Sequence, residues 1–535
     1  MTVDCIFRLF RPGRLLVLKV SYSLTVILVG LNIGDFAAAS SCNNKVLIEQ
    51  NNLPPILLLL KITTSRLTDN EQRSTDNDTM KRFFKIILLA FLGILLIAIA
   101  YVFVTFPPVM AGMAAKTMCS CVFVTGRHPQ SVKDKELQVF PGLSSAAIDI
   151  NKDSTVSATV FWKTSKAIFR KGLGCTLLAE QTEEEVRSQK MVLPSLPANH
   201  DTISWPSGDA PDSISEDINQ ELMQRALDEA FTEIDPEAPI NTHAVVVVYD
   251  GKIIGERYAE GFDKNSRLMG WSMTKSITNA LVGILVKEGK LDVQEPAPVT
   301  EWRQDNRSKI TLHHLLQASS GLEWSESYFS PTADFHKMFI KSDDKGGYAL
   351  SRPLAYEPGT FFQYSSGTTN IISKIIRQTV GDSAYYKFPF EKLFYKIGMT
   401  HAIIEPDASG TFVGSSYSYA TARDWARFGL LYLNDGVWND ERILPAGWVK
   451  YSTTPAPTAD MGRYGAQWWL NAGDANNIEH RKYPDIPADT YWADGFEEQY
   501  VMVIPSKKLV IVRLGVSHHG FDITRLVNGV IAAVE

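Results

Sequence analysis

The sequence predicts an α+β fold in which an antiparallel sheet is flanked by helices and carries an inserted all-helical domain. Two strand-rich runs surround Asp250-Gly251 in HAVVVVYDGKIIGERYAEGF, and this dipeptide is a strong hairpin signal. Two more strand-rich runs, EQYVMVIP and KKLVIVRLG, lie near the C-terminus. A mostly helical and loop stretch separates the two pairs, from about residue 295 to 450. Strands at both ends of a domain, covered by helices, indicate one sheet with an insertion.

The other elements fit this layout. INQELMQRALDEAFTEI has apolar residues at helical spacing, and FDITRLVNGVIAAVE closes the chain as a helix. We therefore assign residues 216–535 to the α+β domain. Residues 106–215 form an accessory region and linker. Its β-type run is STVSATVFWKTSKAIFRKGLGCTLL, and residues 192–215 are rich in Pro, Ser and Asp, as in a linker or a surface strap.

The bulk composition excludes several classes of function. The 535 residues carry a formal net charge of -6, so no basic footprint indicates a nucleic-acid partner. The chain has no His-Glu-x-x-His or paired Cys-x-x-Cys pattern and no phosphate-binding Gly-x-x-x-x-Gly-Lys loop. We therefore expect neither a metal nor an organic cofactor.

An apolar run at 83–105 predicts a transmembrane anchor. The run has about the length that a bilayer core requires, roughly 20 residues. Basic residues precede it in MKRFFK, and Phe106-Pro107-Pro108 ends it. Positive charge before the span predicts that the rest of the chain is exported, to a periplasmic or other extracytoplasmic location.

Met80 stands just before those basic residues, which suggests that it is the true start. Residues 1–79 would then be an over-extended start of the gene, or disordered. The alternative is a genuine first apolar segment near 15–33, with cleavage after AAAS at 37–40.

The five cysteines all lie within the first 175 residues. In an oxidising compartment Cys119 or Cys121 could pair with Cys175, and the sequence does not choose between them. The alternative is three free thiols.

Ser272 and Lys275 lie three positions apart in GWSMTKSITNALVGILVKEGKLDV, at the start of an amphipathic helix. Residues at i and i+3 share one helix face, which brings the lysine amine within reach of the serine oxygen. A serine hydroxyl needs a base, and a buried lysine can be neutral enough to serve. The alternative is that Ser272 only caps the helix.

Several further stretches resemble the serine β-lactamase and penicillin-binding-protein superfamily, particularly its class C-like esterases and 6-aminohexanoate-oligomer hydrolases. Ser-x-x-Lys is the nucleophile motif of that superfamily. ITLHHLLQASSGL, EPGTFFQYSSGTTNIIS, YATARDWARFGLLYLNDGVWNDERILPAGWV and DGFEEQYVMVIPSKKLVIVRLG then follow in the order of the family. The resemblance implies a β-lactamase/transpeptidase-like fold over residues from about 240 to 535 and does not cover the first 200 or so.

By this resemblance Tyr364 is the third catalytic group, which relays a proton between Lys275, Ser272 and the leaving group. The alternative is a packed core aromatic. Ser366 occupies the position where the family usually has asparagine, and a hydroxyl there can support the lysine.

The family's Lys-Thr-Gly strand motif is replaced. Ungapped matching places Thr490 where the lysine would hold a β-lactam carboxylate, and Asp494, Glu497 and Glu498 make the region acidic. We expect an acidic rim that attracts an amine, or else a solvated acidic turn. The backbone amide of Ala493 or Asp494 is the candidate second oxyanion donor.

The remaining site candidates rest on weaker signals. Glu326 and Tyr328 in SGLEWSESY resemble a substrate-cleft segment of the oligomer hydrolases, with a solvated loop as the alternative. His518 follows the last strand and could reach the cleft, although paired histidines on a loop are usually solvated.

These observations predict a membrane-anchored serine hydrolase that cleaves small amides or esters through an acyl-enzyme on Ser272. A β-lactamase or D-Ala-D-Ala peptidase is an alternative, as is a non-catalytic exported sensor of peptidoglycan fragments. The sequence does not indicate the substrate, the direction of acyl transfer or the oligomeric state.

Overall fold

The computed structural model describes residues 2–11, 14–23, 72–198, 202–210, 218–474, 477–517 and 520–535. The chain divides into two compact units, Met1–Ile99 and Ala100–Glu535. In the first unit, strands β1 (Thr2–Arg11) and β2 (Arg14–Ser23) pair as an antiparallel hairpin.

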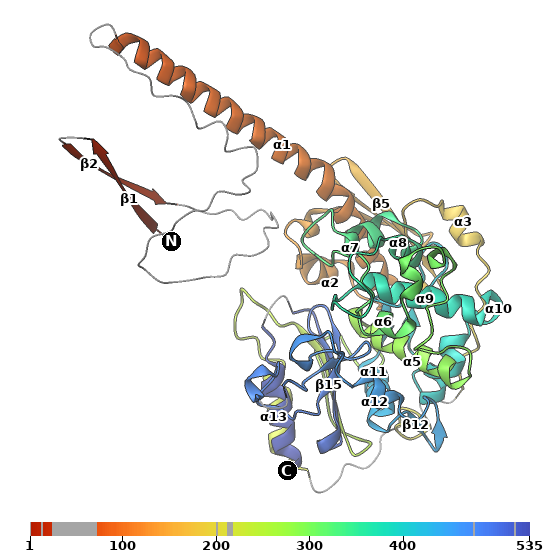
Figure 1. Ribbon diagram of the computed structural model, residues 1–535. Helices are drawn as coiled ribbons and strands as arrows, with labels where there is room; N and C mark the ends of the chain where they lie inside the picture. The colour runs from red at the N-terminus through yellow and green to blue at the C-terminus, as the bar shows by residue number, and fades with distance from the viewer. Residues whose placement is uncertain are drawn as a thin grey trace. The chain divides into compact units, whose positions relative to one another are not determined.

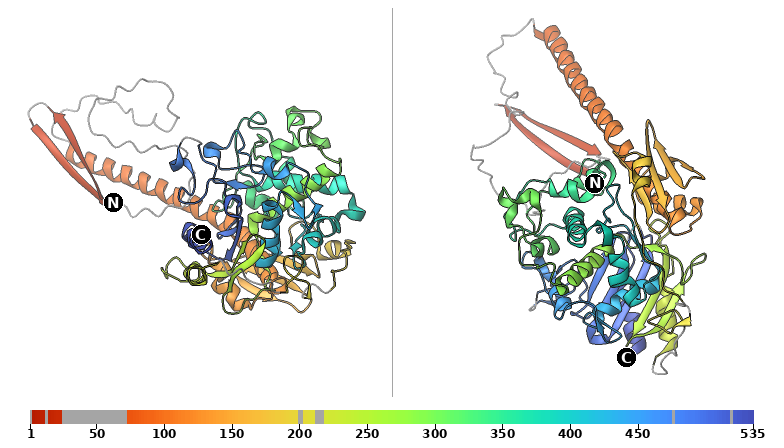
Figure 2. Two further views of the ribbon diagram at one scale, coloured as in Figure 1. Left: turned by 90° about the horizontal axis from the view of Figure 1, so that it is seen from below. Right: turned by 90° about the vertical axis from the view of Figure 1, so that its right-hand side faces the viewer.

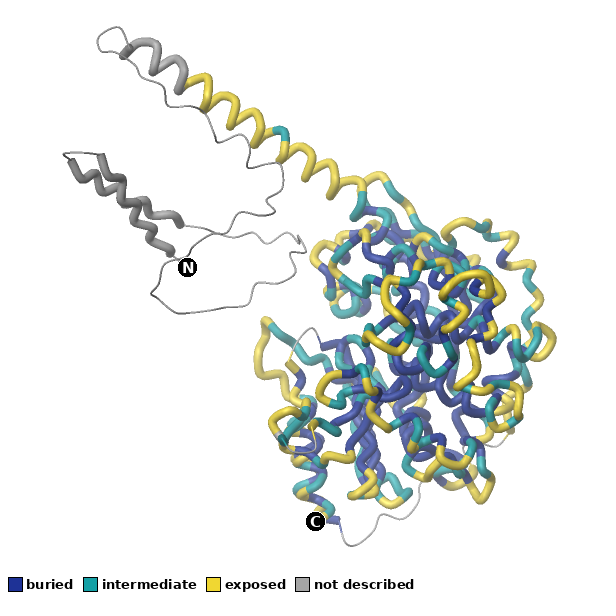
Figure 3. Tube along the Cα trace, in the orientation of Figure 1, coloured by how far each residue is buried: buried dark blue, intermediate teal, exposed yellow. Residues whose placement is uncertain are grey.

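Helix α1 (Gln72–Phe123) contains the apolar run. Its segment Lys81–Phe123 is long and apolar enough to cross a membrane, with a mean hydropathy of 3.1 in a window of which 0% is buried. From Lys81 to Val104 every residue of the helix except Gly93 is exposed (Figure 3). The helix does not end at Pro107-Pro108, as the sequence suggested, but continues to Phe123 with mostly buried side chains.

A six-stranded antiparallel sheet forms the centre of the second unit. Its strand order is β14-β15-β16-β17-β7-β8. The strands are β7 (Thr242–Tyr249), β8 (Lys252–Tyr258), β14 (Trp469–Leu470), β15 (Tyr491–Gly495), β16 (Gln499–Ile504) and β17 (Leu509–Gly515). The two predicted strand pairs are confirmed, and they join through β17 and β7.

Helices cover both faces of this sheet. Helices α4 (Gln220–Glu229) and α13 (Ile523–Val534) pack on the face that carries Val245 and Val247. Helix α11 (Ala422–Leu433) packs on the opposite face (Figures 1 and 2). Because successive strand residues point to opposite faces, the largely apolar runs of β7, β16 and β17 are those of a sheet buried on both sides.

The helical insertion lies between β8 and the last strands of the sheet. Its first helix is α5 (Thr274–Lys287). The other helices are α6 (Leu312–Leu316), α7 (Asp334–His336), α8 (Lys345–Leu350), α9 (Ser366–Val380), α10 (Asp382–Tyr385) and α12 (Trp448–Ser452). Short strands also occur: β9 (Leu268–Met269), β10 (Ile403–Ile404), β11 (Ser418–Ala420), β12 (Val437–Trp438) and β13 (Glu441–Arg442).

The accessory region folds as a separate antiparallel sheet of order β3-β4-β5-β6, with short helices α2 (Pro129–Asp134) and α3 (Glu183–Ser188) beside it. Its strands are β3 (Ala147–Ile150), β4 (Thr155–Val160), β5 (Lys163–Arg170) and β6 (Gly174–Leu178). A disulfide joins Cys119 on α1 to Cys175 on β6, and Cys121 is a buried free thiol.

A buried ion pair attaches α1 to the domain that carries the large sheet. Lys116 pairs with Glu405, whose carboxylate also accepts hydrogen bonds from Ser120 Oγ at 2.9 Å and Cys175 N at 2.6 Å. Buried charges are stable only when they are paired and hydrogen-bonded. Both conditions are met here, so this part of α1 is an integral part of the second unit.

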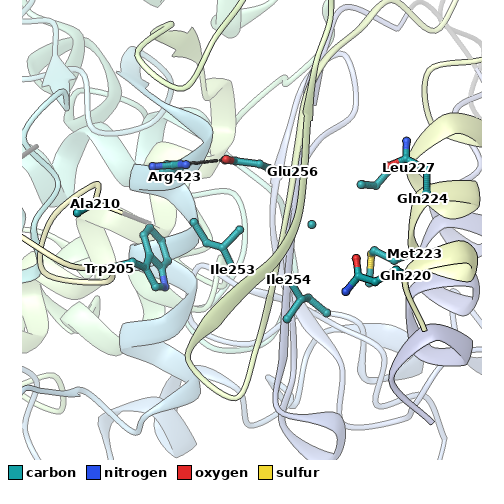
Figure 4. A pocket seen from close by; sticks show the side chains of 11 residues that line it. Trp205, Ala210, Gln220, Met223, Gln224, Leu227, Ile253, Ile254, Glu256 and Arg423 are labelled. Atoms are coloured by element: carbon teal, nitrogen blue, oxygen red, sulfur yellow. Dashed lines mark hydrogen bonds and ion pairs between the residues drawn. The ribbon is translucent and has the colours of Figure 1, made fainter. Parts of the chain in front are cut away.

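Residues 202–210 lie as a strap against α11. Trp205 is buried, and Arg427 on α11 donates hydrogen bonds to Pro206 O and Gly208 O. Arg423 and Glu256 form an ion pair and are among the residues that line a pocket between the strap, α4 and β8 (Figure 4). None of its lining residues belongs to the group around Ser272.

Candidate active site

Ser272 lies in a one-turn 3₁₀ helix, Trp271–Met273, between β9 and α5. Its neighbour Trp271 has a φ of 46°, an uncommon conformation for a residue with a bulky side chain. The N-cap residue of α5 is Met273, and no side chain among the described residues caps the first turn of this helix. The alternative that Ser272 is a helix cap is therefore wrong.

Lys275 occupies the centre of a polar cluster. Its Nζ donates hydrogen bonds to Ser272 Oγ at 3.0 Å, Ser366 Oγ at 3.1 Å and Ser415 O at 2.9 Å. The side chain is only 2% exposed. Burial lowers its pKa to about 8, while the charges of Glu326 and Asp494 oppose that shift. The amine beside Ser272 is therefore far easier to deprotonate than an ordinary lysine.

Tyr364 lies beside the same amine. The Lys275 Nζ is 4.8 Å from the centroid of the Tyr364 ring. The rings of Trp469 and Tyr464 pack against Tyr364 at 5.5 and 6.1 Å. Burial raises the pKa of Tyr364 well above its usual value, and the interaction with the Ser272 hydroxyl opposes this shift. The phenol is thus held in its protonated form next to the serine oxygen.

Ser366 links Lys275 to Glu326. Its Oγ accepts from Lys275 and donates to Glu326 Oε1 at 2.5 Å, and its backbone N donates to Glu326 Oε2 at 3.0 Å. The Trp324 indole also donates to Glu326. Because both carboxylate oxygens are engaged, Glu326 is not a solvated loop residue. The partner of Ser366 could not be predicted from its position in the motif.

Strand β15 passes beside the Ser272 turn. A Cβ added at Gly495 would lie 2.3 Å from Gly270 O, so a side chain here would push the strand away from the turn. Strand β14 pairs only with Tyr491 and Trp492, which leaves the edge from Ala493 to Gly495 uncovered by β14. The predicted oxyanion donors, Ala493 and Asp494, therefore lie on the strand that passes the Ser272 turn. Thr490 directly precedes this strand and is buried.

The acidic segment is not arranged as the sequence suggested. Glu497 is 7% exposed and accepts a hydrogen bond from the Trp271 indole at 3.0 Å. Glu498 accepts one from Phe521 N at 2.9 Å. Asp494 accepts from the Trp492 indole at 3.0 Å. Because Glu497 is buried, the prediction of an open acidic rim and its alternative of a solvated turn are both wrong at this residue.

Strain accompanies this buried turn. Glu497 and Glu498 have φ values of 64° and 62°, where glycine is the usual residue. Burial also raises the pKa of Glu497 to about 8. Through its hydrogen bond to the Trp271 indole, the Glu497 side chain holds the residue that precedes Ser272.

The remaining candidates have different outcomes. Tyr328 packs on Phe335 and Phe496, with ring centroids 4.7 and 5.3 Å apart, and Phe496 in turn packs on Trp271 of the Ser272 turn at 5.6 Å. His518 lies outside the described residues. Lys482, which the motifs did not indicate, lies 5.6 Å from the Trp492 ring and 5.8 Å from the Trp469 ring. Among the described residues, no group of His, Cys, Asp and Glu could hold a metal ion.

The family model for "Beta-lactamase" matches residues 227–527, which is more than half of the chain. The chain belongs to the beta-lactamase family. The predicted family and its β-lactamase/transpeptidase-like fold are therefore confirmed, and the chain is a serine hydrolase by family.

Three proteins to which this beta-lactamase family member is similar share a quarter or less of their aligned residues with it. The 6-aminohexanoate-dimer hydrolase of Paenarthrobacter ureafaciens is 25% identical over 262 residues, which cover 44% of this chain and 66% of that enzyme, just under two thirds of its length. A family VIII carboxylesterase structure is 15% identical, covers 60% of this chain and 98% of that one, and has a TM-score of 0.46. A penicillin-binding protein from Bacillus halodurans is also 15% identical, with coverages of 58% and 99% and a TM-score of 0.45.

Proposed function

We propose that this protein is a membrane-anchored hydrolase that cleaves small amides or esters through an acyl-enzyme on Ser272. One observation carries the proposal: the buried Lys275 amine lies 3.0 Å from the Ser272 oxygen. A lysine whose pKa is about 8 supplies a base near neutral pH. The relationship to a 6-aminohexanoate-dimer hydrolase supports an amide substrate, because the name of that relative describes an amide dimer.

The proposed chemistry assigns one role to each group. Ser272 Oγ attacks the substrate carbonyl while its proton passes to neutral Lys275. Tyr364 relays that proton to the departing amine or alkoxide as the C–N or C–O bond breaks. Water then enters, loses a proton to the same groups and releases the acid. Ser366 and Glu326 hold the Lys275 amine in position throughout.

Backbone amides are the proposed oxyanion donors. The amide of Ser272 and one from Ala493 or Asp494 would stabilise the negative charge on the carbonyl oxygen. The edge of β15 that β14 leaves uncovered supports this assignment, since its amides lie beside the Ser272 turn. Backbone donors need no particular side chain, so they can function without the Lys-Thr-Gly motif.

The anchor is the apolar part of α1, residues 83–105, and the domain assignments made from the sequence are part of this proposal. The Cys119–Cys175 disulfide supports an exported, oxidising location, because such bonds are rare in reducing compartments. Basic residues before the span support the same orientation.

The test compares the full-length protein with Ser272→Ala on p-nitrophenyl butyrate, a chromogenic cephalosporin and a 6-aminohexanoate dimer. We expect the variant to lose activity at least about a thousandfold. Ser276→Ala is the matched control. Ser276 is a buried serine in the first turn of α5 whose hydroxyl donates to Gln467 O at 2.7 Å, not to Lys275.

The pattern of rates separates the alternatives. Preference for the ester or the dimer would support this proposal, while preference for the cephalosporin would favour a β-lactamase. Equal, background rates for all three proteins would contradict turnover. A stable acyl adduct on Ser272, detected by mass spectrometry, would then indicate a sensor.

A further inference from the structure

The β4–β5 hairpin ends in an unusual two-residue loop. Val160 pairs with Lys163, so only Phe161 and Trp162 connect the strands. Phe161 has a φ of 52°, a conformation that such loops normally assign to glycine, asparagine or aspartate. Its ring is 76% exposed and Trp162 is 54% exposed. A bulky aromatic side chain in this conformation costs backbone strain, and most of its apolar surface stays exposed to water, which indicates another role.

The loop contacts α1 where two prolines interrupt the hydrogen bonds of that helix. Pro107 has no N–H, so Phe103 O lacks its usual partner four residues later. The Trp162 indole donates to Phe103 O at 3.1 Å and fills this gap. The Phe161 and Phe103 rings lie 5.3 Å apart. The loop is therefore held against the last turn of the exposed apolar run of α1.

A second exposed aromatic residue lies near the same turn. Phe329 is 71% exposed, and it follows the site residue Tyr328 on the loop before α7. Thr332 of that loop lies 3.4 Å from the Tyr101 hydroxyl on α1. Phe161 and Trp162 thus contact α1 at Phe103, and Phe329 lies three residues before the Thr332 contact with Tyr101.

We propose that Phe161, Trp162 and Phe329 form an interfacial anchor that inserts into the headgroup layer of the bilayer that α1 spans. The proposal rests on the membrane anchor in the proposed function. Aromatic side chains with one polar edge favour this layer, and its position is set by the end of a transmembrane run. The β4–β5 loop contacts α1 at Phe103, at the end of the apolar run, and this contact favours lipid over a protein partner. The anchor would hold the loop of Glu326 and Tyr328 at the membrane surface.

The test places the photoreactive amino acid benzoylphenylalanine at position 161 or 329 of the full-length protein in phosphatidylcholine vesicles. This residue keeps an aromatic ring at each site, so the fold is retained. The matched control carries it at Ile234, which is 78% exposed and lies between α4 and β7. We expect phospholipid adducts, identified by mass, at least tenfold more abundant at 161 and 329 than at 234.

Flotation of the vesicles separates this proposal from the one on which it rests. Protein that floats with the vesicles but gives equal lipid adducts at all three positions would overturn the interfacial anchor alone. Adducts only to another protein would also overturn it. Protein that does not float and forms no adduct would overturn both the transmembrane anchor and this proposal.

Discussion

The pH dependence of catalysis should report the buried state of Lys275. Burial lowers its pKa from 10.5 to about 8, a difference of about 3.4 kcal/mol between the charged and neutral forms. At pH 7 about one molecule in ten would then carry the neutral base, compared with about one in three thousand for an ordinary lysine. We expect kcat/KM to rise about tenfold per pH unit below pH 8 and to level off above it.

Glu326→Gln tests the cause of this profile. The charge of Glu326 raises the pKa of Lys275, so its removal should move the rising limb of kcat/KM to lower pH. Glu323→Gln is the control, because this exposed glutamate of the same loop pairs with Arg352 instead. The assay measures initial rates with p-nitrophenyl butyrate, corrected for spontaneous hydrolysis.

Two results would refute the reasoning. A rising limb centred near pH 10 would mean that burial does not prepare the lysine. A limb near pH 8 that stays in place in Glu326→Gln would mean that another group controls the rate.

Three further predictions concern the surroundings of the site. Ser366→Ala removes the hydroxyl between Lys275 and Glu326 and should lower kcat/KM about tenfold or more. The control Ser365→Ala removes the cap of α9, so it should lower the unfolding free energy by about 1 kcal/mol and retain activity. Equal losses of activity in the two variants would contradict this prediction. The raised pKa of Glu497 stabilises the fold below pH 4.5, and that stability is lost toward pH 8 at about 1.4 kcal/mol per unit. Glu497→Gln should therefore flatten the pH profile of denaturant unfolding over this range, and an unchanged slope would refute the assignment. Cys175→Ser removes the Cys119–Cys175 disulfide, which links residues 56 positions apart, and should lower the unfolding free energy by about 4 kcal/mol. A decrease below about 1 kcal/mol would show that the disulfide does not stabilise the fold.

The sequence predicts those features that depend on local spacing. Ser272 and Lys275 are one helical turn apart, so their contact follows from helix geometry alone. The strand pairs follow from their apolar runs and from turn residues such as Asp250-Gly251. The order of the motifs then indicates the family and, through it, Tyr364.

Features that depend on distant parts of the chain could not be predicted. Glu326 meets Ser366 across 40 positions, and no local pattern encodes that contact. The carbonyl of Ser415, the third partner of Lys275, has no side-chain signature at all. The acidic segment misled the prediction because the burial of Glu497 depends on how the turn packs against Trp271.

The free thiol of Cys121 has a consequence for the durability of the crosslink beside it. Thiol–disulfide exchange begins with a thiolate that attacks a sulfur of the bond. Burial raises the pKa of Cys121 well above its usual value, which leaves almost none of the reactive anion. Two residues along an α-helix also turn the side chain by about 200°, so Cys121 points away from the Cys119 side of α1. A cysteine two positions from a disulfide can therefore persist without shuffling the pairing.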